Sequence, residues 1–252
     1  MKVKTLFTMG WGWAVRYTLK RARFKLGFLW SKIIGRRYWV VAVGGTKVKL
    51  SFSTPYHERL GSFLHRGLHE KKLLEWWASE ARDKRVVYDV GGFNGVYGIV
   101  AATINPAAVV HIFEPDPVNI THIEENVRLN GVRNCVVERK AVGDEDGFLL
   151  FAGDGSTGGR LSPQGTLRVP VVRLDSYEAP DLVKIDVEGG ECAVLRGAQQ
   201  ALQRAPSMLL EVGPATPLAE LKTLLLPLGY HLPEQVPPGN YISQKGTLVF
   251  AD

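Results

Sequence analysis

Short apolar runs alternate with segments of helical spacing from about residue 85 to the C-terminus. Such runs are typical of strands buried on both faces, and the segments between them are typical of covering helices. Strands are predicted at residues 86–88, 109–113, 135–138, 181–187 and 207–212, and helices at 96–102, 119–130, about 191–204 and 218–226. The alternation predicts an α/β fold, a mostly parallel sheet with helices on both faces. A final hairpin, 241–243 with 247–250, predicts an antiparallel C-terminal edge.

A different pattern precedes this alternation. Residues 38–43 and 46–52 flank a Gly-Gly pair, which predicts a hairpin, and residues 70–81 have the spacing of a helix. The chain is therefore divided into an N-terminal extension, residues 1–84, and a nucleotide-binding domain, residues 85–252.

The alternation is also interrupted once, after the third predicted strand. Residues 148–151 and 167–172 predict an inserted antiparallel pair, and the loop between them, 153–165, is rich in Gly and Ser. Long loops of this kind are often lids over a site. We therefore expect this loop to cover a ligand.

A glycine loop follows the first predicted strand of the domain, in Asp89-Val90-Gly91-Gly92-Phe93-Asn94-Gly95. Glycines at 91 and 92 would let the backbone pass close to a ligand. Asp89 could accept hydrogen bonds from an amine or hydroxyl, and Asn94 with Gly91 would face the amino-acid end of a cofactor. The loop lacks the G-x-G-x-x-G spacing of diphosphate-binding loops, which favours S-adenosylmethionine. A tight turn without a ligand is the alternative.

The second predicted strand ends in Glu114, 25 residues after Asp89. An acid at about this offset binds ribose hydroxyls in nucleotide-binding folds, and a carboxylate suits a ribose diol. Favouring the N-terminus of the next helix is the alternative role of Glu114. By analogy with the fold, Asp144, after the third strand, could reach an adenine amine.

A cluster of charged residues ends the fourth predicted strand, in Lys184-Ile185-Asp186-Val187-Glu188-Gly189-Gly190-Glu191. Strand carboxyl ends line the ligand crevice of a doubly wound sheet, so Asp186 should reach the same edge as Asp89 and Glu114. An acid-rich helix start explains Glu188 and Glu191 better than it explains Asp186. Glu211 lies near the end of the next strand.

Charge is distributed unevenly along the 252 residues. Residues 1–57 hold 12 Lys/Arg and no acid, whereas the rest of the chain holds 19 Lys/Arg and 25 Asp/Glu. The first 37 residues also carry interleaved aromatics, which suits an anionic membrane surface. A helix packed on the domain is the alternative. The mildly acidic domain makes nucleic acid an unexpected partner.

Other classes of site find no support in the sequence. The two cysteines give no disulfide framework, and the six histidines show no metal-ligand spacing. The chain has no run of 18 apolar residues that would predict a membrane-spanning helix. We expect a cytoplasmic protein without a metal, docked on the inner face of the membrane if residues 1–37 bind lipid. The sequence leaves the oligomeric state open.

The chain resembles the FkbM-type S-adenosylmethionine-dependent methyltransferases. The matching motifs are DVGGFNG (Asp89–Gly95), FEPDP (Phe113–Pro117), VVRLDS (Val171–Ser176), DLVKIDVEGGECAVLRGA (Asp181–Ala198) and LLEVG (Leu209–Gly213). The resemblance implies a Rossmann-like class I fold with a seven-stranded sheet and methyl transfer, usually to oxygen. Expected acceptors are small molecules, such as secondary metabolites, or glycans and glycolipids. The family commonly has Ala where Gly92 and Gly190 stand, a sterically mild difference.

A hydroxyl acceptor must lose its proton during methyl transfer. Asp186 is the first candidate for the base or acceptor-orienting group, and Glu211 is the second. His57 and His231 are weaker candidates. Two other classes of protein stay open on the sequence: an NAD-dependent oxidoreductase, against which the missing G-x-G pair counts, and a non-catalytic protein that docks on a membrane or an anionic polymer.

Overall fold

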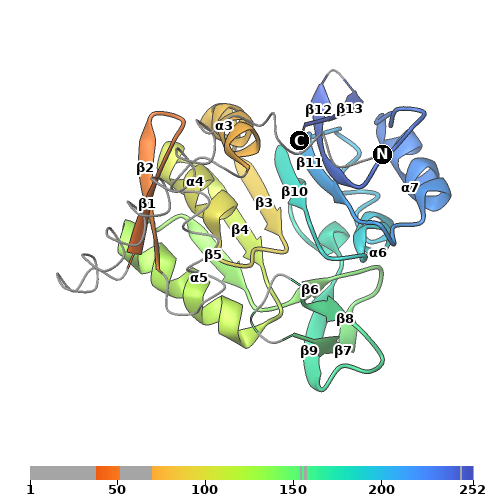
Figure 1. The fold of residues 1–252 in the computed structure, drawn as a ribbon, viewed down its shortest axis with the longest axis horizontal. Helices are drawn as coiled ribbons and strands as arrows, with labels where there is room; N and C mark the ends of the chain where they lie inside the picture. The colour runs from red at the N-terminus through yellow and green to blue at the C-terminus, as the bar shows by residue number, and fades with distance from the viewer. Residues whose placement is uncertain (1–37, 52–69, 154, 156–157, 245, 252) are drawn as a thin grey trace, which may run out of the picture. The chain divides into compact units, whose positions relative to one another are not determined.

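The main sheet has seven strands in the order β13-β12-β11-β10-β3-β4-β5 (Figure 1). The computed structural model describes residues 38–51, 70–153, 155, 158–244 and 246–251. The strand bounds are β3 Val86–Val90, β4 Val109–Phe113, β5 Cys135–Glu138, β10 Leu182–Ile185, β11 Ser207–Val212, β12 Gly239–Gln244 and β13 Thr247–Phe250. The first five strands run parallel, and β12 and β13 form an antiparallel edge. The predicted fold class is confirmed.

The strand order creates a switch point in the sheet. Counted along the chain, the five parallel strands lie in the order 3-2-1-4-5, which is doubly wound. The direction of winding reverses between β3 and β10, which are hydrogen-bonded neighbours. Ligands of such sheets bind in the crevice beyond the carboxyl ends of the strands at this reversal.

Alternate residues of the strands enter two separate cores. Val87, Leu182 and Leu209 pack in one core with α3, α4 and α5, while Val86, Val183 and Met208 pack in the other with α6 and α7. The helices are α3 Lys71–Glu80, α4 Val96–Ile104, α5 Pro117–Asn130, α6 Glu191–Arg196 and α7 Leu218–Leu225, with 3₁₀ turns at Ala81–Asp83, Leu174–Ser176 and Leu226–Leu228. Burial on both faces explains the near-continuous apolar runs of the strands.

The predicted hairpin and the helix after it belong to the same compact body as the sheet. Strands β1 Tyr38–Val43 and β2 Thr46–Ser51 pair as predicted, and their apolar side chains share the core of α4. Ser51 also donates its backbone N–H to Asn126 Oδ1 of α5 at 2.6 Å. The compact unit begins at Trp39, although the sequence analysis grouped these elements with the N-terminal extension.

The insertion after the third parallel strand forms a sheet of its own. Strands β6 Ala141–Val142, β7 Gly147–Ala152, β8 Arg160–Leu161 and β9 Leu167–Val172 lie in the order β6-β9-β7-β8. The predicted antiparallel pairing of β7 with β9 is confirmed. This side sheet has a small core of Ala141, Phe151, Val169 and Val171.

Helix α6 is shorter than predicted, because it ends at Arg196 and not near residue 204. The cause is a close backbone approach at Gly197, where a Cβ would lie 2.0 Å from the carbonyl oxygen of Gly143. From there the chain continues in turns, and the carboxylate of Asp175 accepts the N–H groups of Gln200 and Ala201, each at 2.9 Å.

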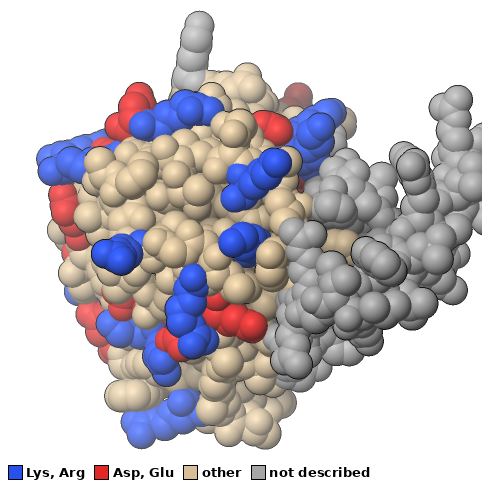
Figure 2. Space-filling model, turned by 90° about the vertical axis from the view of Figure 1, so that its left-hand side faces the viewer, with Lys and Arg blue, Asp and Glu red and all other residues tan. Residues whose placement is uncertain are grey.

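The described surface carries charges of both signs. On the face drawn in Figure 2, basic and acidic side chains are interspersed, without a continuous basic stripe. Every helix in the described ranges is too short or too polar to cross a bilayer.

We expect Trp77→Ala to lower the free energy of unfolding by about 3–5 kcal/mol, as large core truncations do. Trp77 of α3 is fully buried, donates its indole N–H to the carbonyl of Tyr97 at 2.9 Å and meets the Tyr97 ring edge-on. Urea denaturation of the full chain measures the effect.

Trp76→Ala is the matched control, because Trp76 is only partly buried against the same core. Trp76→Ala should lower the free energy of unfolding by less than half as much as Trp77→Ala. Equal losses for the two variants would show that α3 does not pack through Trp77.

Candidate functional site

A cavity of about 510 Å³ opens beyond the carboxyl ends of β3, β4, β10 and β11. It lies at the switch point, where a doubly wound sheet binds its ligands. The predicted site residues among its walls are Gly91, Gly92, Asn94, Glu114, Asp186 and Glu211. Asp89, Gly95 and Asp144 do not line it.

Backbone strain marks the same cavity. Glu70, Phe93 and Glu188 have φ angles of 54°, 50° and 52°, and all three line the cavity. Among the described non-glycine residues, only Ala205 also has a positive φ. Strained backbone persists where surrounding structure enforces it, and it concentrates at functional sites.

The glycine loop is shaped by packing within the protein. A Cβ on Gly91 would lie 1.7 Å from the carbonyl oxygen of Asp186, and a Cβ on Gly92 would lie 2.4 Å from the Ile112 side chain. Both N–H groups donate to the carbonyl of Phe113 at 3.0 Å. The sequence analysis attributed these glycines to space for a ligand. The structure corrects that reason, since neighbouring strand ends require them.

Asp89 lies beneath the cavity wall and not in it. Its side chain is fully buried, and Oδ2 accepts the N–H of Gly98 in α4 at 2.9 Å. Oδ1 has no hydrogen-bond partner in the described structure and lies 3.8 Å from the ammonium of Lys184. Burial raises the pKa of Asp89 to about 6. Asp89 therefore anchors α4 and Lys184, a role different from the predicted contact with a ligand.

Asn94 and Gly95 start helix α4. Asn94 is buried, faces the cavity, and accepts the N–H of Val96 with Oδ1 at 3.1 Å. Gly95 is the N-cap residue, with φ +76°, a left-handed conformation that favours glycine. The structure thus gives Gly95 a conformational role, and its contact with a cofactor stays a prediction.

Glu114 enters the cavity as a buried carboxyl group. Oε2 accepts the N–H of Phe93 at 2.8 Å, and Oε1 accepts the N–H of Asp116 at 2.9 Å. Burial raises the pKa of Glu114 to about 7. Oε1 also accepts from Asn119 Nδ2 at 3.5 Å, so Oε2 is the oxygen that retains a further lone pair for a ligand hydroxyl. Beside it, Asn119 also lines the cavity, with a buried Oδ1 that has no partner in the described ranges.

Lys184, Asp186 and Glu211 form another part of the cavity wall. The ammonium of Lys184 donates to Asp186 Oδ2 at 2.9 Å, and Asp186 is hydrogen-bonded to Glu211. Burial and the charge of Asp186 raise the pKa of Glu211 to about 9. Although burial acts to raise the pKa of Asp186, Lys184 and Glu211 hold it below its usual value. The pKa values of the two carboxyl groups are thus shifted in opposite directions, as occurs when neighbouring carboxyl groups hold one proton between them.

Asp144 lies away from these residues. Its Oδ2 accepts from Arg196 Nη2 of α6 at 2.9 Å, and both side chains are partly exposed. Its contact with an adenine amine stays a prediction, and after β5 the chain turns into the side sheet. Lys140, Ala141 and Val142 line the cavity at this point instead.

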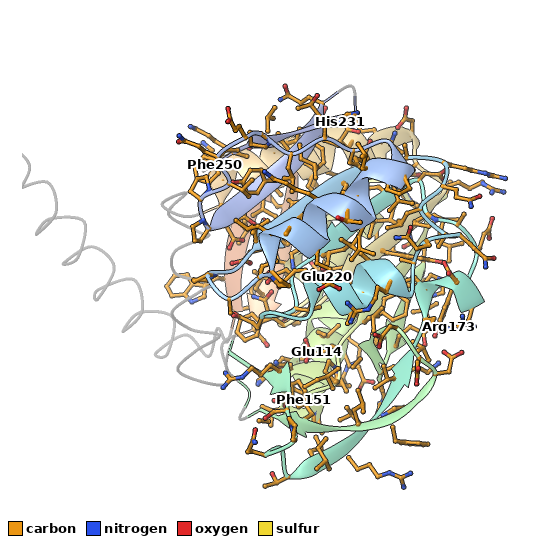
Figure 3. All side chains as sticks on the ribbon, turned by 90° about the vertical axis from the view of Figure 1, so that its right-hand side faces the viewer. Glu114, Phe151, Arg173, Glu220, His231 and Phe250 are labelled. Carbon is orange, nitrogen blue, oxygen red and sulfur yellow. The ribbon has the colours of Figure 1, made fainter. Side chains whose placement is uncertain are left out.

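The side sheet contributes to the wall of the cavity, and the role of loop 153–165 as a lid stays a prediction. Gly159, Arg160 and Leu161, at β8, are among the lining residues. In Figure 3, Phe151 of β7 is labelled just below Glu114, and His231 is labelled at the top of the view, away from both. Phe151 and Glu114 line the cavity, whereas His231 is not among its lining residues. His231 is therefore not part of the site, and His57 lies outside the described residues.

Some of the residues that line the cavity could not be assigned to a site from the sequence. Lys184 is apparent only as a charge within an apolar strand, and Tyr97, Lys140 and Arg160 are unremarkable where they stand. The described residues contain no group of His, Cys, Asp and Glu that could hold a metal ion.

Comparisons with known proteins agree with the predicted resemblance. The curated hexuronic acid methyltransferase AglP of Haloferax volcanii is 27% identical over 155 residues, which are 57% of this chain and 62% of that protein. The 31-O-demethyl-FK506 methyltransferase FkbM of Streptomyces tacrolimicus is 31% identical over 129 residues, 48% of each chain. The chain thus spans about half to two thirds of the length of these relatives.

A solved structure of methyltransferase FkbM from Methylobacillus flagellatus is 16% identical, with a TM-score of 0.44, and the match covers 69% of this chain and 49% of that one. The model of the methyltransferase FkbM domain matches residues 89–232, which include β3, the glycine loop, Glu114, Asp186 and Glu211. The chain belongs to the FkbM methyltransferase domain family, whose cofactor is S-adenosylmethionine.

Proposed function

We propose that this chain transfers a methyl group from S-adenosylmethionine to a hydroxyl oxygen of a sugar, glycolipid or secondary metabolite. The observation that carries the proposal is the hydrogen-bonded Asp186–Glu211 pair, which faces the same cavity as Glu114. The names of two relatives support the acceptor class, since one acts on a hexuronic acid and the other on a demethylated FK506.

The residues of the cavity fit this cofactor. Glu114 offers Oε2, with its spare lone pair, to one hydroxyl of a ribose diol, and the unpartnered Oδ1 of Asn119 offers an acceptor beside it for the other. When bound, S-adenosylmethionine supplies an electrophilic methyl group on a cationic sulfonium. Carboxylates along the wall, at Glu70, Asp186 and Glu188, favour such a cation.

Asp186 and Glu211 are proposed to hold and deprotonate the acceptor. Ionised Asp186 accepts a hydrogen bond from the acceptor hydroxyl and so orients its oxygen for in-line attack, where positioning supplies much of the acceleration. Asp186 would take the acceptor's proton as the oxygen gains the methyl group, while the bond between the methyl carbon and sulfur would break and leave a neutral thioether. Protonated Glu211 cannot take that proton in the same step, so it serves as the hydrogen-bond donor to Asp186.

The remaining sequence-based proposals concern partners and organisation. Residues 1–37, with ten Lys/Arg and no acid, are proposed to bring the enzyme to an anionic membrane surface, where each basic side chain contributes roughly 1 kcal/mol. They lie outside the described residues. A location on the cytoplasmic face of the membrane is likewise a proposal from the sequence.

We expect label from methyl-labelled S-adenosylmethionine to enter hydroxyl groups of an acceptor pool containing sugars, hexuronic acids, glycolipids and polyketides. Mass spectrometry of the products identifies the methylated atom. Label on nitrogen or carbon would contradict the proposed acceptor class, and tight cofactor binding without transfer to any pool would favour the non-catalytic alternative.

Asp186→Asn should reduce turnover by about 10²-fold or more, the usual scale for loss of a general base. The carboxamide can still accept from Lys184 and donate to Glu211, so folding and cofactor affinity should stay near those of the wild type. Asp83→Asn is the control, because Asp83 is an exposed aspartate outside the cavity wall. Unchanged turnover in Asp186→Asn would move the proton-accepting role to another group.

Cofactor affinity should rise as the pH increases through about 7 and should lose this dependence in Glu114→Gln. The ribose hydroxyls donate to Glu114, and its ionised form is the better acceptor. Calorimetric titration between about pH 6 and 8 measures the change. A wild-type affinity that does not vary with pH would argue against the ribose contact.

The pH dependence of the stability of the ligand-free protein gives an independent check of the raised pKa of Glu114. Folded Glu114 keeps its proton to about pH 7, whereas the unfolded chain releases it near 4.5. The folded state therefore binds more protons between these values, and the free energy of unfolding should fall as the pH rises through this range. Glu114→Gln should flatten that slope.

A further inference from the structure

The side chain of Lys184 is almost completely buried at the junction of the glycine loop and the carboxyl pair. It has 6% exposure and comes from the middle of β10, where its backbone pairs with Asp89 of β3. Its ammonium donates to the carbonyl of Gly91 at 3.2 Å and to Asp186 Oδ2 at 2.9 Å. One cation therefore joins the loop after β3 to the acid at the end of β10.

Strand geometry explains this meeting. Successive side chains of a strand point to opposite faces, so Lys184 and Asp186 share a face. That face is the one covered by α4, because Leu182 of the same strand packs in the core of α4, and the ammonium lies 5.3 Å from the centre of the Tyr97 ring.

The charges around Lys184 leave it ionised. Burial alone would lower the pKa of Lys184, but the charges of Asp186 and Asp89 raise it above its usual value, with a further contribution from Glu70. The groups that act on Asp186 come from several elements: Lys184 of β10, Glu211 of β11, Asp89 of β3, Tyr97 of α4 and Glu188 of the following loop.

We propose that Lys184 is the positioning residue of this site: it fastens Asp186 to the glycine loop and keeps that carboxylate ionised, so that the shared proton stays on Glu211. The proposal rests on the proposed function, in which Asp186 accepts the proton of the acceptor. Without the ammonium, Asp186 would face Glu211, Glu188 and Asp89 with no opposing charge beside it.

Lys184 has a competing interpretation as a purely structural ion pair. Asp89 is fully buried beside it, and removing the partner of a buried charge is strongly destabilising. Lys184→Met alone is thus expected to destabilise the fold for reasons unrelated to Asp186. The double variant Lys184→Met with Asp89→Asn removes both charges, and Asn at 89 can still accept the N–H of Gly98.

The decisive measurement is the titration of Asp186 by NMR, with ¹³C-labelled aspartate carboxyl groups in the ligand-free full chain. The Asp186 signal is assigned by its loss in Asp186→Asn. Compared with Asp89→Asn alone, the double variant should titrate Asp186 about 1–3 pH units higher, the usual scale for loss of an adjacent opposite charge. Lys184→Arg in the same background keeps the charge and should restore the low midpoint.

An Asp186 midpoint that stays the same in the folded double variant would overturn the proposal. A second combination of results would also overturn the proposal: the double variant does not fold, and Lys184→Arg with Asp89→Asn folds but titrates Asp186 at a raised midpoint. This readout needs no acceptor, so a failure to find methyl transfer leaves it intact.

Kinetics then separates a positioning role from a structural one. With an acceptor in hand, the acidic limb of kcat/KM against pH should move upward in the double variant, by the same shift as the NMR midpoint. A uniform fall in rate without a shift of the limb would assign Lys184 to structure alone. Weakened cofactor binding without a shift would assign it to the carboxylate of the cofactor.

Discussion

The closeness of two strand ends at the switch point is the constraint on which the site depends. The backbone of Gly91, after β3, touches the carbonyl of Asp186, after β10, so closely that a Cβ would lie 1.7 Å from that oxygen. The same junction brings Lys184 within hydrogen-bonding distance of both loops. Because the loops are fixed to each other, Glu114 on one side and the carboxyl pair of Asp186 and Glu211 on the other face a single cavity.

Much of the fold could be predicted because its periodicity is strong. Fully buried parallel strands such as β3 appear in the sequence as apolar runs. Helix α5 is equally clear, because the capping side chain of Asp116 and Pro117 mark its start, and the left-handed Gly131 marks its end. Glu114 and Asp186 could be located for a related reason, since a carboxyl group at the end of a buried strand reaches the crevice of any doubly wound sheet.

The remaining features depend on tertiary contacts that a linear pattern does not contain. Asp144 follows the third strand as the analogy requires, yet the start of the side sheet turns it toward Arg196. Gly197 looked like part of a helix, although the approach of Gly143 ends the helix there. Lys184 interrupts an apolar strand with a charge, and only the neighbouring strand reveals Asp89 as its partner. The predicted boundary at residue 84 divided the hairpin and α3 from the sheet, because the core that they share with α4 also depends on tertiary contacts.

The side sheet has a small core of its own, made by Ala141, Phe151, Val169 and Val171, apart from the two cores that hold the main sheet. Substitutions in this core or on β8 should therefore alter the part of the cavity wall that the side sheet forms, without disturbing the packing of the main sheet. The side wall of the cavity can therefore vary from one sequence to another independently of the strand-end loops, whose positions are fixed by the packing of the main sheet.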